Sequence, residues 1–174
     1  MCIRDSLPKG WIEETETVIG KMRDFCDEME ELVLGNEIFQ ARTRGIGVIP
    51  PEVALSYGLS GANLRGSGVD WDIRRDANVG LVYDEVDWIV WSHPDGDSFS
   101  RFWVRLQETR EACNILEQLL GGIPAGPIMA KVPRIIKVPA GEAYVATENP
   151  LGEMGFYVVT VSYTHLTLPT KRIV

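Results

Sequence analysis

The chain has 174 residues, of which 45% are hydrophobic and 24% charged, a composition typical of about one folded, soluble domain. Its formal net charge of −8 argues against general nucleic-acid binding, because neutralising phosphates requires a basic face. No apolar run reaches the roughly 18 residues that a membrane-spanning helix needs.

The first predicted element is a long amphipathic helix over residues 12–34, which Gly35 and Asn36 end. One face is acidic. That is typical of a solvated surface, and the alternative is a docking surface for a basic partner. Apolar residues recur at steps of three and four along the other face, at Ile12, Val18, Ile19, Met22, Phe25, Met29, Leu32 and Val33.

Shorter elements follow this helix. We expect a turn of helix over residues 37–42 and a short helix within PPEVALSYG, residues 50–58, with proline at its start and Gly58 past its end. Residues 59–80 show no clean period and contain many glycines, which predicts an ordered loop. The stretch YDEVDWIVW, residues 83–91, alternates partly and is rich in branched and aromatic residues, which favours a strand.

A second long helix is predicted over residues 98–120, capped by Asp97 or Ser98 and ended by Gly121 and Gly122. The Pro- and Gly-rich residues 123–142 predict an extended loop. Residues 142–161 predict two strands around a turn at 149–152. The apolar face of the second helix comprises Phe99, Phe102, Trp103, Leu106, Cys113, Leu116, Leu119 and Leu120.

These elements predict an α+β fold class, with two long amphipathic helices, short strands that include a C-terminal hairpin, and long ordered loops. Two long helices do not close a core alone, and a single hairpin has unpaired edges. We therefore expect the chain to be part of a larger domain or complex.

The segment NLRGSGVDWDIRRD, residues 63–76, is the first candidate for chemistry. Its Gly66 and Gly68 do not make a dinucleotide fingerprint, because Trp71 stands where the third glycine belongs. The glycines instead permit positive φ angles and close backbone approach. For its charged residues we favour structural pairing through guanidinium–carboxylate hydrogen bonds over a proton path. These residues are Arg65, Asp70, Asp72, Arg74, Arg75 and Asp76.

Two other acidic clusters and the cysteines offer weaker candidates. The turn with His93, Asp95 and Asp97 offers too few ligands for a metal ion. It is more typical of a turn that caps a helix. Glu148 and Glu153 have the composition of an acid–base pair, but a surface hairpin is favoured. The three cysteines, Cys2, Cys26 and Cys113, are far apart and form no CxxC, which favours a reducing compartment, with the latter two as small core residues.

Four stretches together carry a family resemblance: RTRGIGVIPPEVALSYGLSGANLRGSGVDWDIRRD, YDEVDW, DGDSFSRFWVRLQETREACNILEQLL and GEAYVATENPLGEMGFYVV. The chain resembles the D subunit of NADH:quinone oxidoreductase, the hydrogenase-large-subunit-like component of respiratory complex I. The resemblance runs from about residue 7 to 160. GPIMAKVPRIIKVPAGEAY is more similar to bacterial than to mitochondrial versions.

The resemblance implies a fold and a role. The fold is a fragment of a nickel–iron-hydrogenase-large-subunit-like domain without its metal-binding cysteine pairs. The subunit lies peripherally, on the cytoplasmic side of the bacterial inner membrane. There it helps to build the chamber where quinone is reduced by electrons from an iron–sulfur cluster in a neighbouring subunit, in electron transfer from NADH that is coupled to proton translocation.

The resemblance also predicts domain boundaries. Residues 7–160 correspond to the middle of the subunit, and residues 1–6 and 161–174 are expected to be non-native flanks. The family's quinone-contacting His and Tyr fall outside this stretch, so we expect no catalytic, cofactor-binding or metal-binding residue here and no activity from the fragment alone. What carries over is scaffold and subunit interface, at Arg65, Gly66, Gly68, Trp71, Asp72, Arg74, Glu148, Pro150, Gly152, Glu153 and Gly155.

Two alternatives stay open. The chain is a short, non-catalytic interaction or assembly module whose acidic first helix is the docking face, or it derives from a metal hydrogenase large subunit. The second alternative requires two cysteine pairs outside this stretch.

Overall fold

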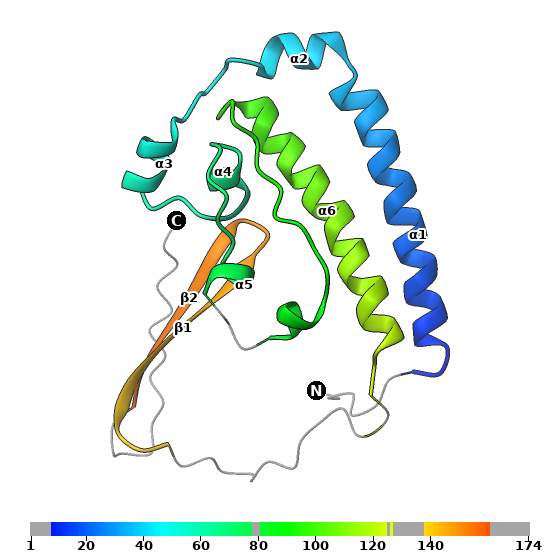
Figure 1. The fold of residues 1–174 in the computed structure, drawn as a ribbon, viewed down its shortest axis with the longest axis vertical. Coiled ribbons are helices and arrows are strands. Elements are labelled where there is room, and N and C mark those ends of the chain that lie inside the picture. Colours follow the sequence, from blue (N-terminus) through cyan, green and yellow to red (C-terminus); the bar gives the residue numbers. More distant parts are fainter. Residues whose placement is uncertain (1–7, 78–80, 125, 127–137, 161–174) are drawn as a thin grey trace.

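The computed structural model describes residues 8–77, 81–124, 126 and 138–160, and the regular structure within these ranges is helical apart from one two-stranded sheet. Helices α1 (Trp11–Met29) and α6 (Ser98–Gly121) run side by side in opposite directions along one edge of the molecule (Figure 1). The hairpin β1–β2 lies on the other side of α6, with the short helices α4 and α5 between them (Figure 1). The mixed helix and antiparallel sheet agree with the predicted α+β class.

The packing of α1 on α6 forms the main apolar core. Its buried members are Cys26, Leu34, Phe99 and Leu106, with Met29, Phe39, Phe102 and Trp103 packed against them. Ion pairs flank this seam: Arg23 binds Glu117 at 2.7 Å, and Arg110 binds Asp27 at 2.7 Å and Glu30 at 2.6 Å. The described thiols, Cys26 and Cys113, are both free and buried, as predicted for small core residues.

The first predicted helix is present, but its apolar face is only partly buried. Ile19 and Cys26 are buried against α6, whereas Val18, Phe25 and Leu32 remain exposed. The predicted apolar face is thus covered by α6 over only part of its width. On α6, Leu116 of the predicted apolar face is likewise 44% exposed.

A π-helical turn, η1 (Glu30–Leu34), ends the first helix. The Gly35 N–H donates to the Glu30 carbonyl at 2.9 Å, which is the i→i−5 bond of a π turn. This wider turn places Leu34 in the core. The Asn36 side chain then accepts hydrogen bonds from two backbone N–H groups of α2 (Glu37–Thr43), the helix predicted over residues 37–42.

The segment predicted as a loop over residues 59–80 contains two short helices. After α3 (Pro51–Ser56), which was predicted, come α4 (Gly61–Arg65) and α5 (Ile73–Asp76). Each is about one turn long, so no apolar periodicity develops for the sequence to reveal. The cap that starts α5 is Asp72, whose side chain accepts from the Arg74 N–H at 2.9 Å.

The strand predicted over residues 83–91 is wrong. A 3₁₀ turn, η2 (Val82–Glu85), begins the stretch, and extended chain follows without a strand partner in the described residues. The Gln118 side chain takes the place of a neighbouring strand. It accepts from the Asp87 N–H at 2.9 Å and donates to the Asp87 carbonyl at 2.7 Å. Branched and aromatic residues therefore indicate extended backbone here. The backbone N–H and carbonyl of Asp87, however, are hydrogen-bonded to a side chain of α6 and not to a neighbouring strand.

The second long helix agrees with its prediction at both ends. Of the two predicted capping residues, Asp97 is the one that caps: its carboxylate accepts from the Ser100 N–H at 2.8 Å. The same carboxylate accepts from the Gly45 N–H at 2.8 Å, which fixes the 44–49 segment to the start of α6.

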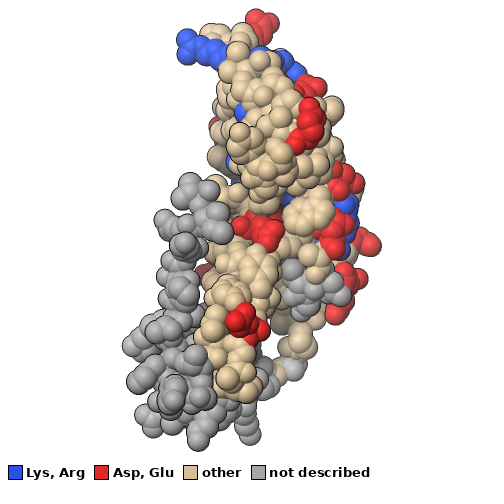
Figure 2. All heavy atoms as spheres, turned by 90° about the vertical axis from the view of Figure 1, so that its left-hand side faces the viewer, with Lys and Arg blue, Asp and Glu red and all other residues tan. Residues whose placement is uncertain are grey.

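The predicted hairpin is present as β1 (Gly141–Asn149) and β2 (Gly152–Thr160), paired antiparallel with Tyr144 opposite Tyr157 and Glu148 opposite Glu153. Most of its side chains are exposed. The face of the molecule that carries α3 and the hairpin is largely uncharged, with scattered acidic side chains and a few basic ones (Figure 2). None of the helices that the structure describes combines the length and the apolar character of a membrane-spanning segment.

Several predictions lie outside the described residues. They are most of the extended loop at 123–142, the proposed flanks at 1–6 and 161–174, and Cys2. The boundaries at residues 7 and 160 stay predictions.

Candidate functional site

The structure brings together the two sets of residues that the sequence singled out separately. Helices α4 and α5 of the 59–77 segment contact β2 and β1, and α4 also contacts α6 (Figure 1). The turn of the hairpin is thereby held against the segment that carries Arg65. The result is a junction of three elements, which we call the Arg65 junction and define by Arg65, Asp72, Arg74, Glu108 and Glu148.

Arg65 is the centre of this junction and is 1% exposed. Its guanidinium binds three carboxylates: Asp72 at 2.9 Å, Glu108 of α6 at 2.5 Å and Glu148 of β1 at 3.0 Å. A guanidinium has five N–H donors in a rigid plane, so one side chain can hold three elements in a fixed geometry. The Arg65 guanidinium also donates a hydrogen bond to the Trp71 carbonyl at 3.3 Å.

Asp72 is 0% exposed and is shared between two arginines. Besides Arg65, it accepts two hydrogen bonds from the Arg74 guanidinium, at 2.8 and 2.6 Å, in a bidentate pair. Arg74 in turn lies 4.8 Å from the centre of the Trp88 ring, a cation–π distance. The aspartate therefore orders α5 and, through Arg74, the extended segment beside it.

The charges in the junction shift each other's pKa. Burial alone raises the pKa of Asp72, but its hydrogen bonds to Arg74 and the charge of Arg65 lower it overall. Burial alone lowers the pKa of Arg65, and the hydrogen bond to Glu108 with the surrounding carboxylates raises it overall. Both groups are therefore held in their charged forms.

Glu148 behaves differently from Asp72. Its Oε1 accepts from Arg65, whereas its Oε2 is buried and has no hydrogen-bond partner among the described residues. Burial raises the pKa of Glu148, and Arg65 compensates only in part. The side chain is 13% exposed, so the expectation that Glu148 lies on a surface hairpin is wrong. It points into the junction because α4 and α5 cover this end of β1.

Glycines allow the backbones to meet at the hairpin turn. Gly61 has a φ of +62°, and a Cβ there would lie 2.5 Å from the Gly152 Cα. Gly152 itself has a φ of +124° and lies against Ser60, whose hydroxyl accepts from the Glu153 N–H at 2.8 Å. Side chains at these positions would force the hairpin away from α4.

Two further glycines of the segment behave as predicted: one adopts a positive φ angle, and the other allows a close approach. Gly68 has a φ of +84° and lies against Pro94. At Gly66, a Cβ would lie 2.8 Å from the Arg101 Cγ. Both place the 59–77 segment close to the start of α6.

The other predicted scaffold residues of the hairpin lie at its surface. Pro150 is exposed in the turn. Glu153 accepts from the Tyr144 hydroxyl at 3.0 Å, and the Tyr144 ring lies over Gly155, where a Cβ would collide with it. Glu153 faces the same side as Glu148 but does not join the junction.

The second half of the charged set forms a separate, exposed group. Arg75 binds Asp70 at 3.1 Å and Asp76 at 2.9 Å, with Arg75 42% and Asp70 62% exposed. The predicted guanidinium–carboxylate pairs thus form in two places, one buried and one exposed to solvent.

The turn before α6 is a cap with a packed histidine. His93 lies against Trp103 with 5.3 Å between ring centroids, and its Nδ1 is 2.9 Å from the Ser100 hydroxyl. Burial raises the pKa of Asp97, while hydrogen bonds from Ser100 and Gly45 lower it overall. In the described part of the chain, no group of three His, Cys, Asp or Glu side chains is arranged to hold a metal ion.

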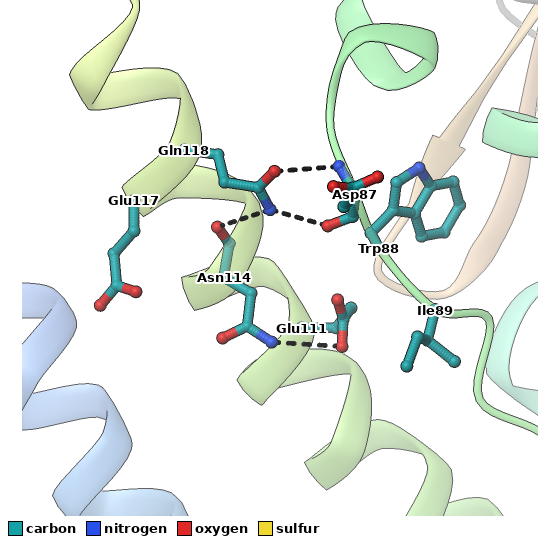
Figure 3. Close-up of a pocket in the computed structure, with 7 residues that line it drawn as sticks. All are labelled: Asp87, Trp88, Ile89, Glu111, Asn114, Glu117 and Gln118. Carbon is teal, nitrogen blue, oxygen red and sulfur yellow. Dashed lines mark hydrogen bonds between the residues drawn. The ribbon is translucent and has the colours of Figure 1, made fainter.

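An open groove of about 540 Å³ lies between the extended segment at 87–89 and α6 (Figure 3). Three of its seven lining residues are acidic, and Gln118 bridges its two walls through Asp87 (Figure 3). None of the predicted site residues lines it. Its residues are Asp87, Trp88, Ile89, Glu111, Asn114, Glu117 and Gln118.

Sequence reasoning missed three residues of the junction and its surroundings. Glu108 is a polar position within an amphipathic helix, where a glutamate is ordinarily solvated, so its sequence context carries no signal. Ser60 and Gly61 meet the hairpin turn only through the tertiary fold. A buried arginine with three carboxylates can position elements rigidly.

Comparison with known proteins identifies relatives over most of the chain. The family model described as respiratory-chain NADH dehydrogenase, 49 kDa subunit, matches residues 2–137. The D subunit of the NADH-quinone oxidoreductase of Carboxydothermus hydrogenoformans is 45% identical over 158 residues, which cover 91% of this chain and 43% of that protein. Its counterpart from Clostridium beijerinckii is 44% identical over 154 residues, covering 88% of this chain and 41% of that protein.

A solved structure is similar as well. A chain of the membrane-bound sulfane sulfur reductase, an archaeal respiratory membrane complex, superposes with a TM-score of 0.83 at 33% identity. The match covers 91% of this chain and 44% of that one. The chain therefore spans less than half the length of the curated relatives and of the solved chain that it matches.

Proposed function

Because the chain belongs to the family of the 49 kDa subunit of respiratory-chain NADH dehydrogenase, we propose that it works as part of the D subunit of an NADH-quinone oxidoreductase. Its work there is structural: it forms part of the wall that holds the quinone-reduction chamber in shape. The activity, electron transfer from NADH to quinone coupled to proton translocation, belongs to the whole complex.

The observation that carries this proposal is the Arg65 junction. One buried guanidinium on α4 binds three carboxylates, at the start of α5, on α6 and on β1, and Gly61 and Gly152 let the hairpin turn dock on α4. An ion network of this kind fixes relative positions, because removing any partner leaves a buried charge unpaired. Electron transfer to a bound quinone needs such fixed walls, since small displacements of a reacting group reduce its rate.

The family membership supports the finer parts of the proposal. They are a hydrogenase-large-subunit-like fold for the whole subunit, a neighbouring subunit that carries the iron–sulfur cluster, and a peripheral position on the cytoplasmic side of the bacterial inner membrane. In this proposal the described residues contribute neither the quinone ligands nor a resident metal. The chain alone should accordingly reduce no quinone with NADH.

A chimeric subunit tests this function. Residues 7–160 replace the homologous span in the D subunit from Clostridium beijerinckii, and NADH-dependent quinone reduction is measured in membranes of that host. We expect the chimera to enter the complex and support reduction. A chimera that folds but stays outside the complex, or that assembles without activity, would contradict the proposal.

Matched variants of the chimera test the structural role. Arg65→Met should reduce assembly of the complex strongly, because three carboxylates lose their shared partner. Arg75→Ala, in the exposed group of the same segment, should leave assembly and activity unchanged. If the two variants assemble equally well, the Arg65 junction has no special role in the function.

The second candidate function is a short interaction module derived from the same subunit. The observation in its favour is the first helix, whose outer face combines exposed apolar residues with acidic ones. It predicts that the chimera fails while the chain alone binds a partner.

A further inference from the structure

The groove between residues 87–89 and α6 contains a buried glutamate that has no cationic partner among the described residues. This residue is Glu111 of α6, which is only 7% exposed. Its Oε2 accepts hydrogen bonds from the Trp91 indole at 3.2 Å and from the Asn114 amide at 3.3 Å, and both donors are neutral. Because buried carboxylates are ordinarily paired with a positive charge, the groove is where we expect the missing charge to bind.

The second oxygen of Glu111 is available to a ligand. In the described part of the chain, Oε1 accepts no hydrogen bond, and it is not among the fully buried unpaired atoms. Figure 3 shows this oxygen pointing away from Asn114 and into the space between the two walls of the groove, towards Asp87. A ligand in the groove can therefore reach one open acceptor of a buried carboxylate.

The opposite wall of the groove provides a second carboxylate, that of Asp87. The third acid of the groove is already neutralised, because the Arg23 guanidinium binds the two oxygens of Glu117 at 3.1 and 2.7 Å. The Gln118 amide is likewise occupied by the backbone of Asp87. Two carboxylates without a cation among the described residues thus remain, one on each wall.

The chemistry of the groove selects the kind of cation. A guanidinium pairs best with both oxygens of a carboxylate, and the Oε2 of Glu111 is already occupied. An ammonium is a compact charge that needs only one acceptor oxygen. Trp88 and Ile89 complete the wall beside Asp87, and such side chains give methylene groups an apolar surface. A metal ion is disfavoured, because no three His, Cys, Asp or Glu side chains of the described residues converge.

We propose that this groove binds a short aliphatic diamine. One ammonium group binds the Oε1 of Glu111, the other binds the carboxylate of Asp87, and the methylene groups lie against Trp88 and Ile89. The groove shares no residue with the Arg65 junction. The inference goes beyond the proposed function, which requires no ligand at this place.

A titration with small amines tests the proposal. Binding of 1,4-diaminobutane to the full 174-residue chain is followed by NMR at the indole N–H of Trp91, which donates to Glu111. n-Butylamine offers one ammonium group and n-butanol offers none. We expect the diamine to bind up to about fivefold more tightly than the monoamine, since its second ion pair is exposed, and n-butanol to give no saturable shift. A capped lysine, Nα-acetyl-lysine methylamide, should bind no more tightly than n-butylamine.

Three variants locate the two ammonium groups. Glu111→Gln should weaken both amines by about tenfold or more, because it removes the charge but keeps an oxygen that accepts from Trp91. Asp87→Asn should weaken the diamine alone, to the affinity of the monoamine. The matched control is Asp84→Asn, an exposed acid of η2 outside the groove, which changes the net charge equally and should leave both affinities unchanged.

Five outcomes would overturn the proposal. The first two are the absence of a saturable shift with the diamine and binding of n-butanol as tight as that of the amines. The next two would show general attraction to a chain of net charge −8: unchanged affinity in Glu111→Gln, or a loss in Asp84→Asn as large as in Asp87→Asn. The fifth is tighter binding of the capped lysine than of the diamine, which would assign the groove to a lysine side chain of another protein.

Circular dichroism of each variant shows whether it is folded. Asp87 is exposed, so Asp87→Asn keeps the proposal testable even if Glu111→Gln does not fold. Failure of the amine titration leaves the chimera result unaffected, so the two proposals fail separately.

Discussion

Two arginines of the same segment show how strongly burial changes the meaning of an ion pair. Arg65 is 1% exposed and binds carboxylates from three elements, whereas Arg75 is 42% exposed and binds only its neighbours Asp70 and Asp76. Exposed pairs contribute little because water screens them and solvates either partner. Breaking a buried network leaves charges unpaired and unsolvated, which is costly.

The largest effect is expected from Arg65→Met. Removal of the guanidinium leaves Glu108 and Glu148 without their shared partner and should lower the free energy of unfolding by about 3–5 kcal/mol. Urea denaturation monitored by circular dichroism measures it. Arg65→Lys is the control: it keeps the charge but not the planar donors, so it should recover only part of the loss. A loss below about 1 kcal/mol for Arg65→Met would erase the contrast with exposed pairs.

Gly61→Ala should have the next largest effect. The new Cβ would lie 2.5 Å from the Gly152 Cα, and the φ of +62° is unfavourable for alanine, so we expect a loss of about 2–4 kcal/mol. Gly58→Ala separates the two causes. Its φ of +65° is similar, but nothing lies within 4 Å, so it should cost only about 1–2 kcal/mol. Equal losses would show that the contact with the hairpin turn adds nothing.

A smaller, pH-dependent effect is expected from Glu148→Gln. The pKa of Glu148 is raised by burial in the folded state, so its protonated form favours folding. That stability is fully present below the unfolded pKa of about 4.3 and is lost as the pH rises through the folded value. The Gln variant should therefore gain stability relative to the wild type as the pH rises from about 4.3 through the raised folded pKa.

Asp72 provides the opposite sign for comparison within the same junction. Its pKa is lowered by Arg74 and Arg65 against the effect of burial, so its contribution is present above the unfolded pKa and lost as the pH falls. The deficit of Asp72→Asn relative to the wild type should thus shrink towards acid pH. Parallel pH profiles for the two variants would contradict the assignment of Glu148 as the poorly compensated carboxyl.

The smallest effect is expected from Arg75→Ala, at most about 0.5 kcal/mol, because its partners Asp70 and Asp76 stay solvated when it is removed. Thermal denaturation at low and high salt measures it, and added salt should reduce the difference further. A loss approaching that of Arg65→Met would show that exposure does not separate the two groups.

The location of the candidate site was predictable in part. The sequence singled out the 63–76 segment and the hairpin turn, and it indicated guanidinium–carboxylate pairing within the first. It held no sign that the two meet, because Arg65 and Glu148 are far apart along the chain and Glu108 resembles any solvated helix position. Whether these residues shape a quinone chamber stays a prediction.

The sequence by itself determined the two long helices, the capped start of the second one at Asp97 or Ser98, and the hairpin with its turn. These depend on apolar period and on residues that begin or end an element, and both act over a few neighbouring positions. Only the tertiary structure decided which half of the apolar face of α1 is covered, that residues 86–92 extend along α6 without a strand, and that Arg65 gathers its carboxylates. The physical reason is that burial and pairing between distant segments depend on which surfaces meet, and local pattern does not encode that.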